Sequence, residues 1–281
     1  MIEIAGVNVN SGQLTALGLT ELERSVLAAK QKSPVVYSYN SLDDLKFELK
    51  MRSNIVKAAK TLHNSGADFA GFDDSRCNKR YWIRTDRGGF QLRNGIMPST
   101  AINDIFHNGD QYAFECATAI VIVLYKAVID TLGEAVFNRY FQDLLLWDWN
   151  YDRNLRLVSN PNLAEAYVGD ILYFKNPDYN PRTPEWQGEN VVKLGNDLYY
   201  GHGIGITSSQ GMITALNKAR KPGSKISAHL SNEVVNPDFD ALRQLQYGRS
   251  NSITAAVTDH DGWSISAKIG TKTYIYQGRG A

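Results

Sequence analysis

An apolar run headed by a cysteine, Cys116 to Tyr125, constrains the fold of this chain more than any other feature. The run is too short to cross a bilayer as a helix, so it has to be buried in a protein core. It follows a glycine break at Gly109-Asp110, and this pattern predicts a buried helix that closes near Gly133. Glu115 directly precedes the cysteine. The segment therefore predicts a thiol and a carboxyl group side by side in the first turns of a core helix.

The place of Cys116 near a helix start allows two interpretations. Unpaired N–H groups and the helix dipole favour an anion there, which would lower the thiol pKa and make a thiolate available. A lone cysteine is otherwise most often a small buried apolar residue. The segment alone leaves open whether Cys116 is a nucleophile or a packing residue.

Composition excludes several classes of protein. The chain has 281 residues, of which 43% are hydrophobic and 21% charged, and a formal net charge of +1. These values are typical of a globular protein, and they give no electrostatic reason to expect a nucleic-acid or membrane partner. The start, Met1 to Ile4, has no signal-peptide features, which favours synthesis in the cytoplasm.

The cysteines and histidines predict neither a metal site nor a cofactor. Cys77 and Cys116 have no zinc-binding spacing, and the histidines form no ligand pattern. Cys77 lies in the polar stretch Asp73 to Arg80, which predicts an exposed loop and an incidental cysteine.

The first half of the chain is predicted to be mainly helical. Residues 1–40 are weakly patterned and predict an N-terminal arm with short helical pieces. The remaining signals are a Ser41-capped helix to about Gly66, a hairpin of Trp82–Arg84 with Phe90–Leu92, a short helix capped by Ser99, and an amphipathic helix over Glu134–Leu145.

The second half is rich in short apolar stretches separated by Gly, Pro and Asn. They predict antiparallel strands of one sheet over residues 146–149, 171–174, 190–194 and 198–206. Helices followed by strands indicate an α+β fold, with the sheet packed against the Cys116 helix. Two more helices are expected over 210–220 and 239–245. We predict one domain over residues 1–247 and a C-terminal extension over 248–281 that forms a β-hairpin.

Three carboxyl or imidazole groups could assist a reactive cysteine. Acyl transfer by cysteine needs a thiol, a proton carrier and donors for the oxyanion. Glu189 follows a glycine at a predicted strand start, His202 lies between two glycines within a predicted strand, and Glu115 adjoins the thiol. Glycines in a strand often permit close approach of another group.

Each of these groups also has a commoner structural explanation. Glu189 could be a solvated acid, His202 a hydrogen-bonded core histidine, and Glu115 a first-turn acid that stabilises the helix dipole. Large aromatic residues are usually core or cleft-wall residues. This applies to Phe69, Trp149, Tyr173 and Trp186.

Taken together, these stretches resemble the small transglutaminases of spore-forming bacilli, the protein-glutamine gamma-glutamyltransferases of the spore coat. The resemblance runs in the same order over roughly residues 35–245, and the extension beyond 248 exceeds the family core. The matching stretches are Lys46–Lys50, Asn54–His63, Tyr112–Ile122, Gly169–Pro177, Trp186–Val191 and Gly201–Gly203.

The resemblance implies a catalytic domain with an NlpC/P60 (papain-like) core and a calcium-independent reaction. A glutamine side chain acylates the thiol, ammonia leaves, and a lysine amine takes the acyl group to form an isopeptide crosslink. The implied partners are proteins with accessible Gln and Lys, above all spore coat proteins. The implied location is the mother-cell cytoplasm at synthesis and the spore coat afterwards.

The resemblance also implies roles for the candidate residues. Cys116 is the nucleophile, Glu189 the main acid/base partner, Glu115 a second and partly redundant carboxylate, and His202 a supporting residue. The family's active site is a tunnel with aromatic walls. The candidates for substrate contacts in it are Phe69, Trp149, Tyr173 and Trp186.

Like charges disfavour each other, so a carboxylate raises the pKa of a neighbouring thiol. We therefore expect a neutral Cys116 thiol beside a Glu189 carboxylate at rest, with Glu189 taking the thiol proton during attack. The Cys116 backbone N–H at the helix start is the natural first oxyanion donor. The sequence identifies no second donor.

Two alternatives remain. A cysteine peptidase or amidase of the NlpC/P60 type, acting on cell-wall peptides, would share the order of Cys helix and sheet and the Gly169-Asp170 turn. The missing secretion signal and Glu189 weigh against it. A structural coat protein with a decayed site is the other alternative, and the intact Cys116, Glu115, Glu189 and His202 weigh against that one.

Overall fold

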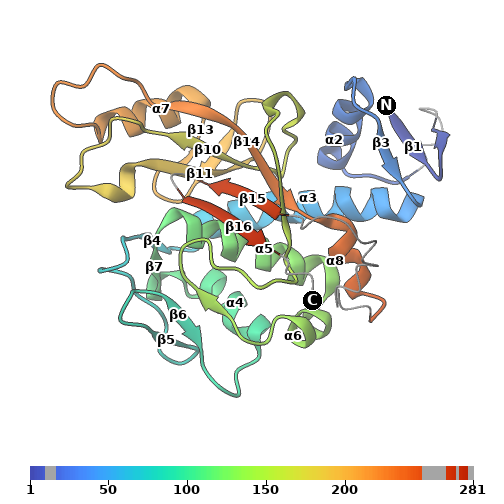
Figure 1. The fold of residues 1–281 in the computed structure, drawn as a ribbon. Helices are drawn as coiled ribbons and strands as arrows, with labels where there is room; N and C mark the ends of the chain where they lie inside the picture. The colour runs from blue at the N-terminus through green and yellow to red at the C-terminus, as the bar shows by residue number, and fades with distance from the viewer. Residues whose placement is uncertain (10–16, 249–263, 270–271, 278–281) are drawn as a thin grey trace.

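The helix that carries Cys116, α5 (Cys116–Leu132), lies at the centre of the protein (Figure 1). The computed structural model describes residues 1–9, 17–248, 264–269 and 272–277. Ile120 to Leu124 are fully buried, and α3 (Leu42–His63) packs along the helix. The predicted core helix and its end at Gly133 are thereby confirmed.

The helix begins later than its apolar pattern predicts. A 3₁₀ turn, η1 (Gly109–Gln111), and a short strand, β7 (Ala113–Phe114), come between the glycine break and Cys116. β7 pairs in parallel with β4 (Asp68–Phe69). The strand ends at Phe114 and Glu115 is the N-cap, so Cys116 is the first helical residue, within the predicted first turns.

A six-stranded antiparallel sheet lies against α5, as predicted. Its strand order is β13-β12-β11-β10-β14-β9. The strands are β9 (Leu157–Asn160), β10 (Ile171–Lys175), β11 (Gly188–Lys193), β12 (Tyr199–Gly201), β13 (Gly205–Thr207) and β14 (His229–Pro237).

Alternating side chains of the sheet fill two separate cores, because successive strand residues point to opposite faces. Ile171 and Val192 belong to the large core built around α5. Leu172 and Val191, their neighbours, pack in a second core with Met212 and other residues of α7 (Ser209–Lys218). The sheet therefore separates a layer of α3 and α5 from α7 in a mixed α/β protein (Figure 1).

Two of the predicted strands differ in the structure. Residues 146–149 do not join the main sheet; instead β8 (Leu145–Leu146) pairs with β6 (Phe90–Leu92), which also forms the predicted hairpin with β5 (Trp82–Arg84). Residues 198–206 form two strands, β12 and β13, with a turn between them. His202 therefore lies in a hairpin turn and not inside a strand.

The helices predicted to start near Ser41 and near residue 239 are confirmed, whereas the bounds of two other predicted helices differ. Ser41 caps α3 through Asp44, and α8 spans Phe239–Leu245. α4 (Pro98–His107) begins at a proline with Met97 as its N-cap, so Ser99 is not the cap. A proline is preorganised for the first helical position, which explains the earlier start. α6 (Glu134–Tyr140) ends before the predicted Leu145.

Cys77 is buried, which corrects the prediction of an exposed loop. The backbone of Arg76 exchanges hydrogen bonds with Ala113 in both directions, at 2.9 and 2.8 Å. This bridge draws the loop onto the strand that leads to α5. Burial raises the pKa of the Cys77 thiol to about 11, against the effect of nearby Arg84, so it rests as a neutral thiol.

The N-terminal region is a small sheet with a helix, not a set of short helical pieces. β1 (Ile2–Ile4) pairs antiparallel with β2 (Val7–Asn8) and in parallel with β3 (Tyr37–Tyr39). α2 (Glu21–Lys32) begins with a capping box of Thr20 and Glu23. Figure 1 shows these elements together at one end of α3.

A buried ionic network joins this region to α3 and the sheet. Glu48 accepts from Lys30 at 2.6 Å and from Arg52 at 2.7 Å, and Arg52 also contacts Asp170 at 2.6 Å. Burial would raise the pKa of Glu48, but the two cations outweigh it and lower the pKa to about 2. All four side chains are at most 7% exposed, so each depends on its partners for solvation.

Arg52→Ala is expected to lower the free energy of unfolding by about 3–5 kcal/mol, because it leaves Asp170 buried without an ion-pair partner and Glu48 with Lys30 alone. Chemical denaturation of the variant measures this loss. Arg76→Ala is the matched control, since its pair with Asp68 is largely exposed and is worth at most about 1 kcal/mol. Equal losses in the two variants would show that the buried network does not stabilise the fold.

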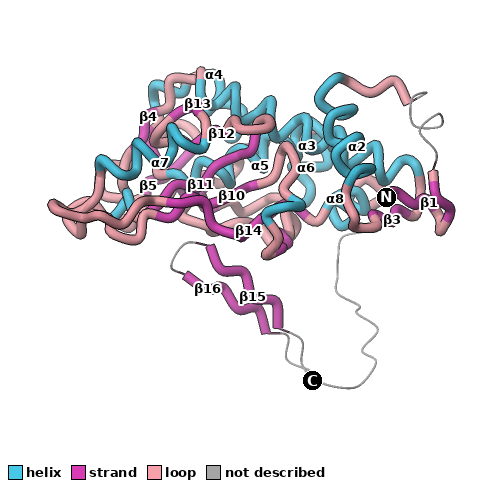
Figure 2. Tube along the Cα trace, turned by 90° about the horizontal axis from the view of Figure 1, so that it is seen from above, coloured by secondary structure: helices cyan, strands magenta, loops and turns pink. Residues whose placement is uncertain are grey.

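The C-terminal strands β15 (Ser264–Ile269) and β16 (Lys272–Gln277) pair antiparallel with each other (Figure 2). The residues that join them, 270–271, and the preceding 249–263 lie outside the described residues. The division into a domain over 1–247 and an extension over 248–281 stays a prediction.

Candidate active site

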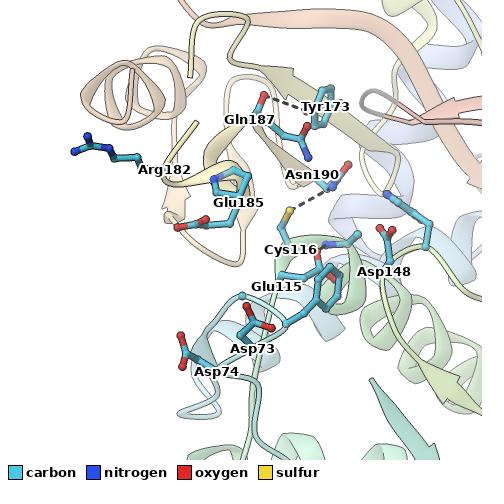
Figure 3. Close-up of a pocket in the computed structure, with 16 residues that line it drawn as sticks. Asp73, Asp74, Glu115, Cys116, Asp148, Tyr173, Arg182, Glu185, Gln187 and Asn190 are labelled. Atoms are coloured by element: carbon cyan, nitrogen blue, oxygen red, sulfur yellow. Dashed lines mark hydrogen bonds between the residues drawn. The ribbon is translucent and has the colours of Figure 1, made fainter. Parts of the chain in front are cut away.

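Cys116 opens onto a pocket of about 530 Å³ (Figure 3). Its walls come from the loop after β4, the start of α5, the segment around Asp148 and Trp149, and the start of β11. Cys116 itself is 8% exposed. The pocket therefore gives a small substrate group access to a thiol that is otherwise enclosed.

The carboxyl group of Glu115 caps the helix that carries the thiol. One oxygen accepts the Ala117 N–H at 2.6 Å, and the other accepts the Thr118 N–H at 2.7 Å. Burial raises the pKa of Glu115 in spite of these bonds. Glu115 therefore lines the pocket, but both of its oxygens are engaged with the helix start.

Glu189 is fully buried at the start of β11. Its Oε1 accepts the Gly203 N–H at 3.1 Å, while its Oε2 has no hydrogen-bond partner among the described residues. A side chain at Gly201 would collide with the Glu189 carboxyl, since its Cβ would lie 2.7 Å from Oε1. Gly201 therefore makes room for Glu189.

The protonation states differ from the expected resting pair. Burial raises the pKa of Glu189 to about 8, partly offset by the Gly203 N–H. Burial and the nearby Glu189 and Glu115 raise the pKa of Cys116 well above its usual value. The thiol is neutral, as expected, but Glu189 is mostly protonated below pH 8 rather than a resting carboxylate. The helix dipole does not produce a thiolate, because burial outweighs it.

Both ring nitrogens of His202 are engaged, so it cannot act as a free base in this arrangement. Its Nε2–H donates to the Asp68 carbonyl at 3.0 Å, because a carbonyl can only accept. Its Nδ1 then accepts from the Tyr200 hydroxyl at 3.0 Å. The ring stacks on Phe114, and burial lowers its pKa to about 4. The His202 imidazole is therefore neutral and is held in place between β12 and β7.

The four predicted wall aromatics fall into two groups. Trp149 and Tyr173 line the pocket beside Cys116. Phe69 and Trp186 contact each other with ring centroids 5.2 Å apart and pack over Gly203, on the side of Glu189. They are not among the lining residues of this pocket, and their contact with substrate stays a prediction.

Asn190 is the residue nearest to the thiol that sequence reasoning missed. Its Nδ2 donates to the Cys116 sulfur at 3.3 Å, which Figure 3 shows as a dashed line. The pairing of β10 with β11 places Tyr173 opposite Asn190, so both face α5. The sequence feature that could have identified Asn190 is its position directly after Glu189, at the start of a strand that begins with a glycine.

The pocket is also acidic. Asp73, Asp74, Asp148 and Glu185 line it, together with Arg182 (Figure 3). In the part of the chain that the structure describes, no group of three or more His, Cys, Asp or Glu side chains is arranged to hold a metal ion. None of the described helices is long and apolar enough to cross a membrane.

Comparison with known proteins identifies the family. A family model described as protein-glutamine gamma-glutamyltransferase matches residues 1–246. A protein of that name from Bacillus pumilus is 44% identical over 87% of this chain and 99% of its own length. A second, from Bacillus cereus strain B4264, is 42% identical over 90% of each chain.

A solved structure agrees with this assignment. It is a transglutaminase from Geobacillus stearothermophilus without its C-terminal extension, and it is 50% identical to this chain. The match covers 73% of this chain and 98% of the other, with a TM-score of 0.70. The chain therefore belongs to the protein-glutamine gamma-glutamyltransferase family and is a transglutaminase.

Proposed function

We propose that this transglutaminase acts through a Cys116 thioester, releases ammonia and needs no calcium. The observation that carries the proposal is the Cys116 thiol at a helix N-terminus, lining a pocket. The buried Glu189 carboxyl, which raises the thiol pKa, is the candidate base. A nucleophile coupled to a neighbouring base is what covalent acyl transfer requires.

In the first half-reaction, the Cys116 sulfur attacks the side-chain carbonyl carbon of a glutamine. Glu189, in its carboxylate form, takes the thiol proton as the bond to sulfur forms. The tetrahedral intermediate collapses, and Glu189 returns the proton to the departing nitrogen, so that ammonia leaves and a thioester remains. Proton transfer of this kind contributes about 10²–10⁴ in rate.

In the second half-reaction, a lysine amine attacks the thioester carbon. Glu189 takes a proton from the attacking nitrogen and gives it to the departing sulfur, so that the C–S bond breaks, the isopeptide forms and the Cys116 thiol is restored. The acidic wall of Asp73, Asp74 and Glu185 suits this step, because it attracts the positive ammonium of the approaching lysine.

The proposal extends to the core fold and to the substrates. The antiparallel sheet packed on the Cys helix supports an NlpC/P60 (papain-like) core. The resemblance of the sequence to spore coat enzymes supports spore coat proteins as partners, with synthesis in the mother cell. Crosslinking of isolated coat fractions by the added enzyme tests this, and fractions that gain no crosslinks would contradict it.

One assay tests the proposed reaction. The enzyme is incubated with a glutamine peptide and a fluorescent primary amine in the presence of a calcium chelator. We expect amine incorporation and ammonia release in equal amounts. Hydrolysis of the peptide without incorporation would favour the cysteine peptidase, and no turnover with an unreactive Cys116 would favour a structural protein.

The rate of acylation is expected to rise with pH up to about 8 and then to level off. The active form of Glu189 is the carboxylate, and its pKa of about 8 means that this form increases about tenfold per pH unit below that value. A profile of kcat/KM for the glutamine donor between pH 6 and 9 measures this. A flat profile, or one that falls over this range, would contradict the role of Glu189 as the base.

A further inference from the structure

We propose that the side-chain amide of Asn190 is the second oxyanion donor of the site, opposite the Cys116 backbone N–H. The inference rests on the proposed Cys116 thioester mechanism. It assigns to Asn190 a direct contact with the substrate carbonyl oxygen.

The first oxyanion donor follows from the helix geometry. As the first residue of α5, Cys116 has no acceptor for its N–H within the helix. Glu115 takes the N–H groups of Ala117 and Thr118 instead. The Cys116 N–H thus remains at the positive end of the helix, beside its own sulfur, where it favours a developing negative charge.

Asn190 supplies a donor on the strand that faces this helix end. Its Nδ2 lies 3.3 Å from the Cys116 sulfur. In the tetrahedral intermediate the oxyanion is bonded to the carbon that the sulfur has attacked, so it lies only two bonds from the sulfur. A donor that now contacts the sulfur is therefore within reach of that oxygen, for which donors about 2.7–3.1 Å away are effective.

The environment of Asn190 fits a substrate contact better than a purely structural role. The residue is 6% exposed, and its Oδ1 has no hydrogen-bond partner among the described residues. Most buried amide oxygens have a partner, and the unpaired Oδ1 of Asn190 belongs to a residue that lines the pocket. Asn54, a half-buried amide whose Nδ2 donates to the Thr131 hydroxyl at 2.8 Å, lies remote from the thiol and serves for comparison.

Rotation of Asn190 toward substrate is not required, because the pocket already includes it. Asn190 and Tyr173 face each other across β10 and β11, and both line the pocket at Cys116. The Tyr173 hydroxyl donates to the Gln187 carbonyl at 3.2 Å, which occupies its hydrogen and leaves the amide as the donor that faces the sulfur.

Two substitutions and two reactions test the proposal. Asn190→Ala removes the amide, and Asn190→Leu replaces it with an apolar side chain of similar volume. Each is assayed for transfer from a glutamine peptide to an amine, and for alkylation of Cys116 by iodoacetamide. Alkylation displaces iodide from a tetrahedral carbon and forms no oxyanion, so it reports the thiol alone.

For both variants we expect kcat to fall about 10²–10³-fold, with a much smaller change in the KM of the glutamine donor. The rate of alkylation should stay within a few-fold of the unsubstituted enzyme across the pH range. Asn54→Ala, which removes a half-buried amide far from the thiol, should keep its kcat within a few-fold. Thermal unfolding curves of all variants check that each one is folded under the assay conditions.

Two results would overturn the assignment. A kcat within a few-fold of the unsubstituted enzyme in both Asn190 variants would exclude a donor role. A fall in the alkylation rate as large as the fall in kcat would show that Asn190 acts only by placing the thiol. If the proposed Cys116 thioester mechanism is itself wrong, the result differs: the Cys116→Ala variant keeps its transfer activity.

Discussion

Cys116→Ala is expected to abolish amine incorporation and ammonia release together. Removal of the nucleophile in a covalent mechanism lowers kcat on the order of 10⁴–10⁶-fold, because the remaining groups have no acyl acceptor to assist. The fold should remain intact, since alanine occupies the first position of α5 without loss of the Glu115 cap. Incorporation of a fluorescent amine into a glutamine peptide measures the effect.

Cys77→Ala provides the matched control for this prediction. Cys77 is also buried, also has a raised thiol pKa, and lies outside the pocket. Its substitution should leave kcat within a few-fold. If Cys77→Ala were the inactive variant and Cys116→Ala the active one, the assignment of the nucleophile would be wrong.

Glu189→Ala is expected to lower kcat by about 10²–10⁴-fold, while Glu115→Ala lowers it much less. Glu189 has a free oxygen and a pKa of about 8, which suits a group that takes and returns a proton near neutral pH. Glu115 has both oxygens bound to helix N–H groups. Its removal should mainly cost stability, by about 0.5–2 kcal/mol for a lost N-cap.

The pH profile separates these two carboxyl groups further. The rise toward pH 8 should persist in Glu115→Ala, shifted slightly to lower pH, because Glu115 raises the pKa of Glu189. It should disappear in Glu189→Ala. Complete loss of activity in Glu115→Ala together with normal activity in Glu189→Ala would reverse the two assignments.

The sequence predicted those parts of the fold that local signals determine. The Cys116 helix, the Ser41 cap and the hairpin of β5 and β6 follow from apolar spacing, a capping residue and turn residues close by in the chain. The N-terminal sheet was missed because β1 pairs with β3 from more than thirty residues away. No short-range pattern specifies such a pairing.

The sequence identified candidate site residues, but not their protonation states or all of their contacts. Cys116 and Glu115 lie at the start of α5 and Glu189 at the start of β11, and the catalytic roles proposed for them and for His202 stay predictions. The protonated state of Glu189 depends on complete burial, which the sequence does not specify. Asn190 was missed because its contact with Cys116 depends on the packing of β11 against α5.

Trapping of the acyl-enzyme tests the central claim most directly. The enzyme is mixed with a glutamine peptide without any amine, quenched in acid within seconds, and digested for mass spectrometry. The account predicts a label on the fragment that contains Cys116, with the mass of the peptide minus ammonia, that disappears when an amine is added before the quench. A label on any other residue, or amine transfer by Cys116→Ala at the unsubstituted rate, would contradict it.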